Sequence, residues 1–270
     1  ERELIFAPLL SFLFPGRTAW VVHTNPWRSS GLVSYLRLCA IRALLFLSRL
    51  RTIAVSRHVQ SLLQSNLPHL CQPLMIPNIP SLRYESCLSR PLATSSSKHV
   101  SPNQLTILYV GRLSLDKGLD VILALAHLHP EFSFVLVGEV IAKDLNVSSL
   151  PSNINQIGFC ADPLSWYQSA SVFLFPSLHE GGRPLALLEA ISCGLPCVAS
   201  DIPSIREFLP EIFLATPGSV SSFSSKLLLI TDCMLNQPNL ISSTLESTRR
   251  TALIPRRVRS QLYLRLLGMA

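Results

Sequence analysis

The chain has 270 residues, of which 48% are hydrophobic and 14% charged, a balance that indicates a folded protein with a buried core and excludes a disordered one. Its 23 Lys and Arg residues exceed its 16 Asp and Glu residues, and the net charge of +7 suits an anionic partner such as a phosphate ester or an acidic membrane surface. The sequence has no dense basic tract with interleaved aromatic residues, so nucleic acid is not expected as a partner. Seven irregularly spaced cysteines indicate reduced thiols in a cytoplasm-like compartment.

The first part of the chain, residues 1–85, alternates short apolar runs with helical stretches. Three of these runs are typical of buried strands: "AWVVHTNPW" (19–27), "TIAVS" (52–56) and "PLMIPN" (73–78). Strands separated by helical segments predict parallel pairing, because parallel neighbours need a crossover connection.

The helical stretch between the first two strands, "LVSYLRLCAIRALLFLSRL" (32–50), confines its polar residues to an arc of roughly 140° at helical spacing. Its arginines interrupt the apolar run too often for a membrane span. Two interpretations remain open: a core helix with one solvated edge, or a helix that lies on an anionic bilayer with Arg37, Arg42 and Arg49 at the headgroups.

Residues 86–103 lose hydrophobic periodicity and collect Ser and Pro, which indicates a linker between a domain over 1–85 and a domain over 104–255; residues 256–270 form a terminal helix. In the second domain a helix, "LDVILALAHL" (119–128), follows the first of five apolar strands. Repeated strand–helix units of this kind predict a doubly wound parallel sheet. The five strands are "LTILYV" (105–110), "FSFVLVG" (132–138), "INQIG" (154–158), "SVFLFP" (171–176) and "LPCVAS" (195–200).

Glycines and charged residues follow these strands at their carboxyl ends, where doubly wound sheets bind ligands. Arg112 and Lys117, two cations in one strand-to-helix loop, predict a clamp for a diphosphate. The alternative is that Lys117 pairs with its neighbour Asp116 on a solvated loop.

The "EGGRP" turn (180–184) carries a second phosphate signal. Its two glycines let the backbone approach a ligand, and Pro184 at the first helical position turns the next amides outward, where they attract phosphate. Glu189 lies five residues beyond Pro184, or about 7.5 Å further along the helix. One acid thus lies at the start of the helix and the other further along it. This separation fits a nucleotide sugar, which has hydroxyls on both sides of its diphosphate. The alternative is that Glu189 forms a local cap or salt bridge.

The sequence does not predict a metal site. His179 precedes Glu180 as in a zinc-protease helix, but no second histidine follows at the needed spacing, and no Asp-x-Asp motif is present in the sequence. No metal and no other cofactor are therefore expected.

Four motifs, "ILYVGRLSLDKGLD", "FVLVGE", "INQIGF" and "FPSLHEGGRPLALLEAISCGLPCVASDIPSIREFL", together resemble the donor-binding domain of the retaining glycosyltransferases of family 4. The resemblance is close over residues 105–210 and looser over 19–80. It implies an α/β protein of the GT-B type, with two Rossmann-like doubly wound parallel-sheet domains, the first incomplete. It also implies a retaining hexosyltransferase that moves a sugar from a nucleotide-sugar donor to an acceptor by front-face attack.

The resemblance assigns roles residue by residue. Arg112 and Lys117 match the basic pair on the donor pyrophosphate, Glu180 matches the acid on the transferred sugar, and His23 matches a histidine that faces this sugar from the other domain. Glu189 matches the acid that holds the ribose. The full donor-binding set consists of Gly111, Gly138, Glu139, Phe159, Gly181, Gly182, Leu185 and Glu189.

The chain departs from the family pattern in two ways. Eight residues separate Glu180 from Glu189 where the family has seven, and the first strand–helix–strand unit of the acceptor domain, with its glycine-rich loop, is missing. We therefore expect an N-terminally truncated enzyme that binds a nucleoside diphosphate but transfers sugar poorly. Two alternatives stay open: a non-catalytic nucleotide-binding remnant and a GT-B nucleotide-sugar epimerase. The expected acceptor is a lipid-linked or polysaccharide precursor, and the expected location is the cytoplasm, at the inner face of an anionic membrane if helix 32–50 meets one.

Overall fold

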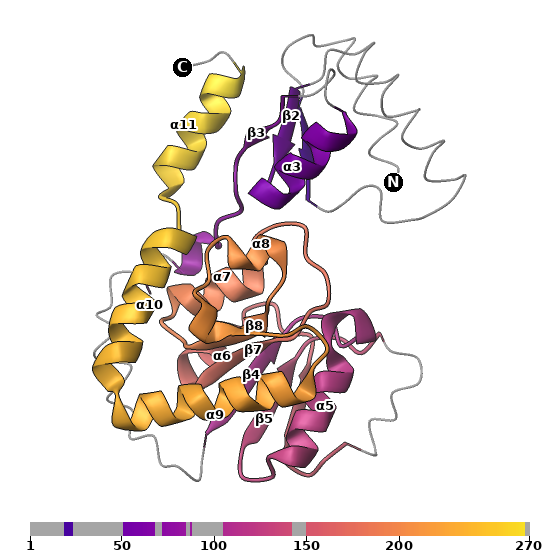
Figure 1. The fold of residues 1–270 in the computed structure, drawn as a ribbon, viewed down its shortest axis with the longest axis vertical. Helices are drawn as coiled ribbons and strands as arrows, with labels where there is room; N and C mark the ends of the chain where they lie inside the picture. The colour runs from indigo at the N-terminus through magenta and orange to yellow at the C-terminus, as the bar shows by residue number, and fades with distance from the viewer. Residues whose placement is uncertain are drawn as a thin grey trace. The chain divides into compact units, whose positions relative to one another are not determined.

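The computed structural model describes residues 19–23, 51–67, 72–84, 87, 105–141 and 150–267 (Figure 1). The chain divides into two compact units. Unit 1 consists of Glu1–Asn78, Gly181–Arg183 and Ile254–Ala270, and unit 2 of Ile79–Glu180 and Pro184–Leu253. The helix expected over 32–50 and, apart from Cys87, the linker expected over 86–103 lie outside the described residues.

Unit 1 contains a parallel sheet of three described strands in the order β1-β2-β3. The strands are β1 (Ala19–Val22), β2 (Arg51–Ala54) and β3 (Leu74–Met75), so each of the three strands predicted in this part of the sequence is confirmed. Helix α3 (Arg57–Asn66) follows β2, and Ser56 caps it by accepting a hydrogen bond from the Val59 amide at 3.1 Å. Helix α11 (Arg256–Leu267) belongs to the same unit.

The tip of the glycine turn, Gly181–Arg183, is also part of unit 1. The Ser56 hydroxyl donates to the carbonyl oxygen of Gly181 at 2.6 Å, and the Asn78 amide donates to that of Arg183 at 3.0 Å. A Cβ on Gly182 would collide with the side chain of Val55. Only glycine therefore fits at the second position of this turn.

Unit 2 is built on a parallel sheet of six strands in the order β6-β5-β4-β7-β8-β9. Every residue of β7 and β8 is buried, as expected for strands covered on both faces. The five predicted strands are confirmed, whereas the two-residue β9 is too short to have shown a pattern. The strands are β4 (Thr106–Val110), β5 (Ser133–Val137), β6 (Ile154–Gly158), β7 (Val172–Phe175), β8 (Cys197–Ser200) and β9 (Leu214–Ala215).

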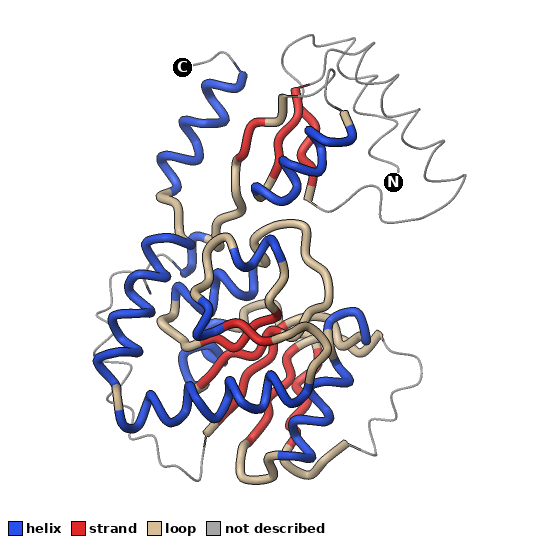
Figure 2. Tube along the Cα trace, in the orientation of Figure 1, coloured by secondary structure: helices blue, strands red, loops and turns tan. Residues whose placement is uncertain are grey.

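Helices cover both faces of this sheet, as the blue and red layers of Figure 2 show. Helix α5 (Leu119–Leu128) has the predicted bounds and leads from β4 to β5, while α7 (Leu185–Ser192) leads from β7 to β8 in the opposite direction along the sheet. Right-handed crossovers place two such helices on opposite faces. Helix α9 (Val220–Asn236) packs against α5, and α10 (Pro238–Ala252) packs against α7. The shorter elements are α6 (Leu164–Ser169), α8 (Pro203–Arg206), η1 (Leu82–Tyr84), η3 (Leu115–Lys117) and η5 (Glu211–Phe213).

The strand order reverses between β4 and β7. From β4 the chain moves outward to β5 and β6, and after β6 it returns to the other side of β4 to form β7. In doubly wound sheets such a reversal opens a crevice at the carboxyl ends of the two strands, and ligands bind there. A ligand site is therefore expected at the loops after β4 and β7.

Asn153 connects α5 to the start of β6. Its amide nitrogen lies 3.0 Å from the carbonyl oxygen of Ala126, 3.1 Å from that of His129 and 3.0 Å from that of Phe132. We expect Asn153→Ala to lower the free energy of unfolding by about 1–2 kcal/mol, because half-buried carbonyls lose their donor. Urea titration measures this loss. The exposed Asn155 on β6 gives the matched control Asn155→Ala, and an equal loss in both variants would contradict the role of Asn153.

Candidate functional site

The carboxyl edge of β4, β5 and β6 is lined by backbone. The amide of Gly111 donates to the carbonyl of Val137 at 2.9 Å, and the amide of Gly138 donates to the carbonyl of Gly158 at 2.7 Å. Gly138 has a φ of 149°, and a Cβ added to it would collide with the carbonyl oxygen of Gly111. This edge therefore stays free of side chains at Gly111 and Gly138, and a ligand can approach the backbone closely there.

The loop after β4 carries Lys117 to the point where the strand order reverses, at the carboxyl ends of β4 and β7. Gly118 closes the loop in the left-handed region, with a φ of 77°, and the amide of Leu178 donates to the carbonyl of Asp116 at 3.0 Å. Lys117 forms an ion pair with Glu180, from the segment after β7, and the two side chains are 20% and 19% exposed. The two charged residues predicted after these neighbouring strands thus meet at the reversal point.

The alternative pairing of Lys117 with Asp116 is wrong. Asp116 instead accepts a hydrogen bond from the Ser114 hydroxyl at 2.6 Å, and this bond holds the pKa of the Asp116 carboxyl below its usual value. The ammonium group of Lys117 reaches across to the next strand and away from its own loop.

Two buried serines hold Glu180. The Ser177 hydroxyl, on a side chain that is 1% exposed, lies 2.9 Å from Oε1 of Glu180 and 3.2 Å from the carbonyl oxygen of His179. The hydroxyl of Ser204, in α8, donates to the backbone carbonyl of Glu180 at 2.7 Å. Both the carboxylate and the backbone of Glu180 are therefore fixed.

Arg112 is exposed at the start of the same loop as Lys117. Its backbone carbonyl accepts a hydrogen bond from the Tyr109 hydroxyl at 2.8 Å. Burial raises the pKa of Tyr109, so this hydroxyl stays protonated and remains a donor at neutral pH. The loop is anchored at Tyr109 while the guanidinium group of Arg112 extends into solvent.

Glu189 lies on α7, which begins one residue later than predicted. Pro184 has a ψ of 132° and precedes the helix as its N-cap, so the first helical residue is Leu185. The Tyr167 hydroxyl, from α6, donates to Oε2 of Glu189 at 3.1 Å, and the Tyr84 ring packs edge-on against Tyr167 with 5.8 Å between ring centroids. Burial raises the pKa of Glu189, and the hydrogen bond from Tyr167 partly offsets this effect. Among the described residues, the hydroxyl of Tyr167 is thus the hydrogen-bond donor to Glu189.

Four other predicted residues are exposed, whereas Gly181 and Gly182 are buried. Phe159, directly after β6, is 73% exposed, and Leu185, at the start of α7, is 52% exposed. Glu139 follows β5 and is exposed, with its backbone carbonyl bonded to the amide of Leu113 at 2.8 Å. His23 follows β1 in unit 1 and is exposed as well. Phe159 and Leu185 offer apolar surface at the carboxyl ends of the strands of unit 2.

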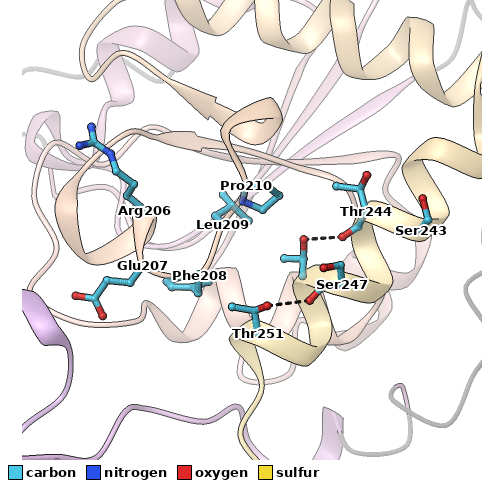
Figure 3. A pocket seen from close by; sticks show the side chains of 10 residues that line it. Arg206, Glu207, Phe208, Leu209, Pro210, Ser243, Thr244, Ser247 and Thr251 are labelled. Atoms are coloured by element: carbon cyan, nitrogen blue, oxygen red, sulfur yellow. Dashed lines mark hydrogen bonds between the residues drawn. The ribbon is translucent and has the colours of Figure 1, made fainter.

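A cavity of about 480 Å³ lies elsewhere in unit 2, between the segment around α8 and the hydroxyl-rich face of α10 (Figure 3). Two of its hydroxyl groups donate inside the helix: Thr248 donates to the carbonyl of Thr244 at 2.7 Å and Thr251 to that of Ser247 at 3.1 Å. The guanidinium of Arg206, on its rim, is held by both carboxylate oxygens of Asp201 at 2.7 Å. None of the predicted site residues lines this cavity, so it does not replace the crevice between β4 and β7 as the candidate site.

Within the described ranges, no cluster of three His, Cys, Asp or Glu side chains could hold a metal ion, and no helix is both long and apolar enough to cross a membrane.

The family assignment rests on unit 2. Residues 104–232 match the family model for glycosyl transferases group 1. Residues 104–232 belong to this family. The matched residues include the loop with Arg112 and Lys117, the pair of Lys117 with Glu180, and the helix that carries Glu189. The predicted assignment to the family 4 glycosyltransferases is therefore confirmed.

Curated relatives are similar to only part of this chain. An uncharacterized glycosyltransferase of Haemophilus influenzae is 29% identical over 160 residues, which cover 53% of this chain and 43% of the relative. The UDP-Gal:alpha-D-GlcNAc-diphosphoundecaprenol alpha-1,3-galactosyltransferase of Escherichia coli is 34% identical over 117 residues, or 39% of this chain and 30% of the relative. The chain thus spans less than half the length of these relatives.

Solved structures support the fold over nearly the whole chain. The sucrose-phosphate synthase of Thermosynechococcus elongatus has a TM-score of 0.73 at 20% identity and covers 97% of this chain, which covers 71% of it. The Anabaena protein HepE, solved in complex with UDP, has a TM-score of 0.70 at 18% identity, with 99% of this chain and 74% of that chain covered. The predicted GT-B class, an α/β fold with two parallel sheets, is confirmed.

Sequence reasoning missed the uncharged members of the candidate site. Ser177, Ser204 and Tyr167 each hold one of the two acids, but none is charged and none follows a strand directly. The one signal for Ser177 is its position three residues before Glu180, which lets a serine hydroxyl reach a nearby carboxylate.

Proposed function

We propose that this chain contains the donor site of a retaining hexosyltransferase, which moves a sugar from a nucleotide sugar to an acceptor with retention of configuration. The observation that supports this best is the ion pair of Lys117 with Glu180 at the reversal point between β4 and β7, beside the side-chain-free edge at Gly111 and Gly138. A cation, a hydroxyl-binding acid and exposed backbone are the groups that a sugar diphosphate requires.

The proposed roles follow the layout of unit 2. Lys117 and Arg112 bind the diphosphate and neutralise the charge on the leaving group. Glu180 accepts hydrogen bonds from the hydroxyls of the transferred sugar, and Glu189 accepts them from the ribose. We also propose, from the family resemblance, that Gly181, Gly182, Glu139, His23, Phe159 and Leu185 contribute to donor binding.

We also propose residues 104–255 as the donor-binding domain and a lipid-linked or polysaccharide precursor as the acceptor. The name of the Escherichia coli relative, which acts on a sugar diphosphoundecaprenol, supports a lipid-linked acceptor. A second Escherichia coli relative, 41% identical over 64 residues, is an O-antigen chain mannosyltransferase. The first name specifies a lipid-linked acceptor, and the second refers to the O-antigen chain.

Thermal unfolding tests the donor site with UDP, GDP, uridine and guanosine as probes. We expect one of the two diphosphates to stabilise the chain by about 2.7 kcal/mol at a hundred times its dissociation constant, because only the native site binds it. The matching nucleoside should bind more weakly, since it lacks the groups that Lys117 and Arg112 contact. No shift with either diphosphate would overturn the proposal. NMR of the product then separates transfer with retention from release of an epimerised sugar nucleotide.

A further inference from the structure

Lys117 already has an anionic partner in the crevice between β4 and β7. Its ammonium group is paired with Oε1 of Glu180, and the two side chains are only 20% and 19% exposed. Glu180 therefore occupies the position of a negative group on the cation that the proposed function assigns to the donor diphosphate. A diphosphate that arrives must compete with this carboxylate.

We infer that Lys117 exchanges Glu180 for the donor diphosphate, and that Ser177 is the positioning residue that keeps Glu180 in place when this exchange occurs. The inference rests on the proposed function, because it takes a nucleoside diphosphate as the competing anion. Beyond the proposed function, the inference states that Glu180 competes with the diphosphate for Lys117. It also gives the buried Ser177 a role.

The hydrogen bonds on Glu180 explain how the acid stays in place. Lys117 and Ser177 both bond Oε1, while Oε2 has no hydrogen bond to any of the described residues. Ser204 holds the backbone carbonyl of Glu180 independently. When Lys117 turns to the diphosphate, Ser177 and Ser204 therefore still hold the acid, and Oε2 can accept a hydrogen bond from a sugar hydroxyl. Ser177 itself is buried and does not contact the ligand.

The exchange lowers the affinity for a bare diphosphate and favours a diphosphate that carries a sugar. A ligand must first break the Lys117–Glu180 pair, and the apparent dissociation constant rises with the fraction of molecules in which this pair is formed. A bare diphosphate has no sugar hydroxyl to donate to the released Glu180, whereas a sugar nucleotide forms hydrogen bonds with it. The same acid thus weakens UDP binding and strengthens UDP-sugar binding.

Isothermal calorimetry on the full chain with UDP, UDP-glucose, GDP and GDP-mannose tests the exchange. We expect Glu180→Gln to bind the bare diphosphate at least about threefold more tightly. The Lys117–Glu180 pair is then absent, so Lys117 is available to the diphosphate in a larger fraction of the molecules. The sugar nucleotide should lose its advantage over the bare diphosphate. Glu246→Gln is the matched control, because it removes an exposed ion pair with Arg250 in the same unit. Weaker binding of the bare diphosphate to Glu180→Gln would overturn the exchange.

Ser177→Ala tests the positioning role. We expect it to leave the affinity for the bare diphosphate within about twofold and to reduce the advantage of the sugar nucleotide about tenfold, since the lost hydrogen bond is to a charged group. In the Glu180→Gln background the same change should have no further effect, because Ser177 acts through the carboxylate. Ser192→Ala, which removes another buried hydroxyl, bonded to the carbonyl of Leu188 at 2.7 Å, is the control. Equal losses for both ligands, or additive losses in the double variant, would overturn the role of Ser177.

These outcomes are distinct from a failure of the proposed function. If the unaltered chain binds neither UDP nor GDP, the donor site itself is wrong and the inference is overturned with it. If the chain binds a diphosphate and Lys117→Ala weakens that binding, the donor site stands, and the response of Glu180→Gln alone decides the exchange.

Discussion

Lys117→Ala should weaken the binding of UDP or GDP by about 10- to 150-fold, which corresponds to about 1.5–3 kcal/mol for one hydrogen bond to a charged phosphate oxygen. Arg112→Ala should cause a loss of the same kind, because both cations lie on the loop after β4 at the reversal point of the sheet. The affinity for uridine or guanosine should stay unchanged, since a nucleoside has no phosphate to contact. Calorimetry with each nucleoside and its diphosphate measures both effects.

Two control variants remove a positive charge elsewhere in unit 2. Lys226 is bonded to the carbonyl of Glu211 at 2.9 Å, and Arg250 is paired with Glu246 on the surface of α10. Lys226→Ala and Arg250→Ala should leave diphosphate affinity within about twofold, because screening by salt weakens distant surface charges. If Lys117→Ala lowers nucleoside and diphosphate affinity equally, the phosphate role is wrong and the lysine instead supports the shape of the crevice.

Strands β4, β5, β7 and β8 could be predicted because they are mostly apolar runs, while β6, "INQIG", has a weaker pattern with polar residues at its centre. Helix α5 has the predicted bounds because Gly118, in the left-handed region, sets its start. Strand β9 could not be predicted, since two residues, Leu214 and Ala215, give no period; it exists because β8 offers an open edge beside it. The start of α7 was predicted one residue early because proline is common both before and at the first helical position.

The candidate site was predictable where it depends on charge at strand ends and not where it depends on neutral hydroxyls. Lys117 and Glu180 follow neighbouring strands, so their meeting follows from the topology. Tyr167 reaches Glu189 only through the packing of α6 beside α7, and nothing in its local sequence separates it from other tyrosines. For Ser177 the spacing of three residues to Glu180 is the one local signal. The partner of Lys117 also could not be predicted from the sequence. Asp116 is nearer along the chain, but its carboxylate accepts a hydrogen bond from the Ser114 hydroxyl.

Glu189→Gln should stabilise the folded chain at neutral pH. Burial raises the pKa of Glu189 in the folded state above its unfolded value of about 4.3, so the unfolded chain gives up its proton first as the pH rises. The free energy of unfolding therefore falls from that pH up to the folded pKa and stays lowered above it. Glutamine avoids this loss and can still accept the hydrogen bond of Tyr167. The gain should be present at pH 7 and absent at about pH 3, where the carboxyl is protonated in both states.

The same Glu189→Gln variant should bind nucleosides and nucleoside diphosphates about tenfold or more weakly, because a neutral amide replaces the carboxylate that accepts hydrogen bonds from the ribose, and a hydrogen bond to a charged group contributes about 1.5–3 kcal/mol. Stability and binding thus change in opposite directions at one residue, as expected where a buried acid is kept for its ligand. Denaturant titration at the two pH values and calorimetry with uridine and UDP measure both. Glu246→Gln, at an exposed site on α10, should change neither. A Glu189→Gln chain that is more stable but binds the nucleoside as tightly as before would place the ribose away from Glu189 and leave this acid as the partner of Tyr167 alone.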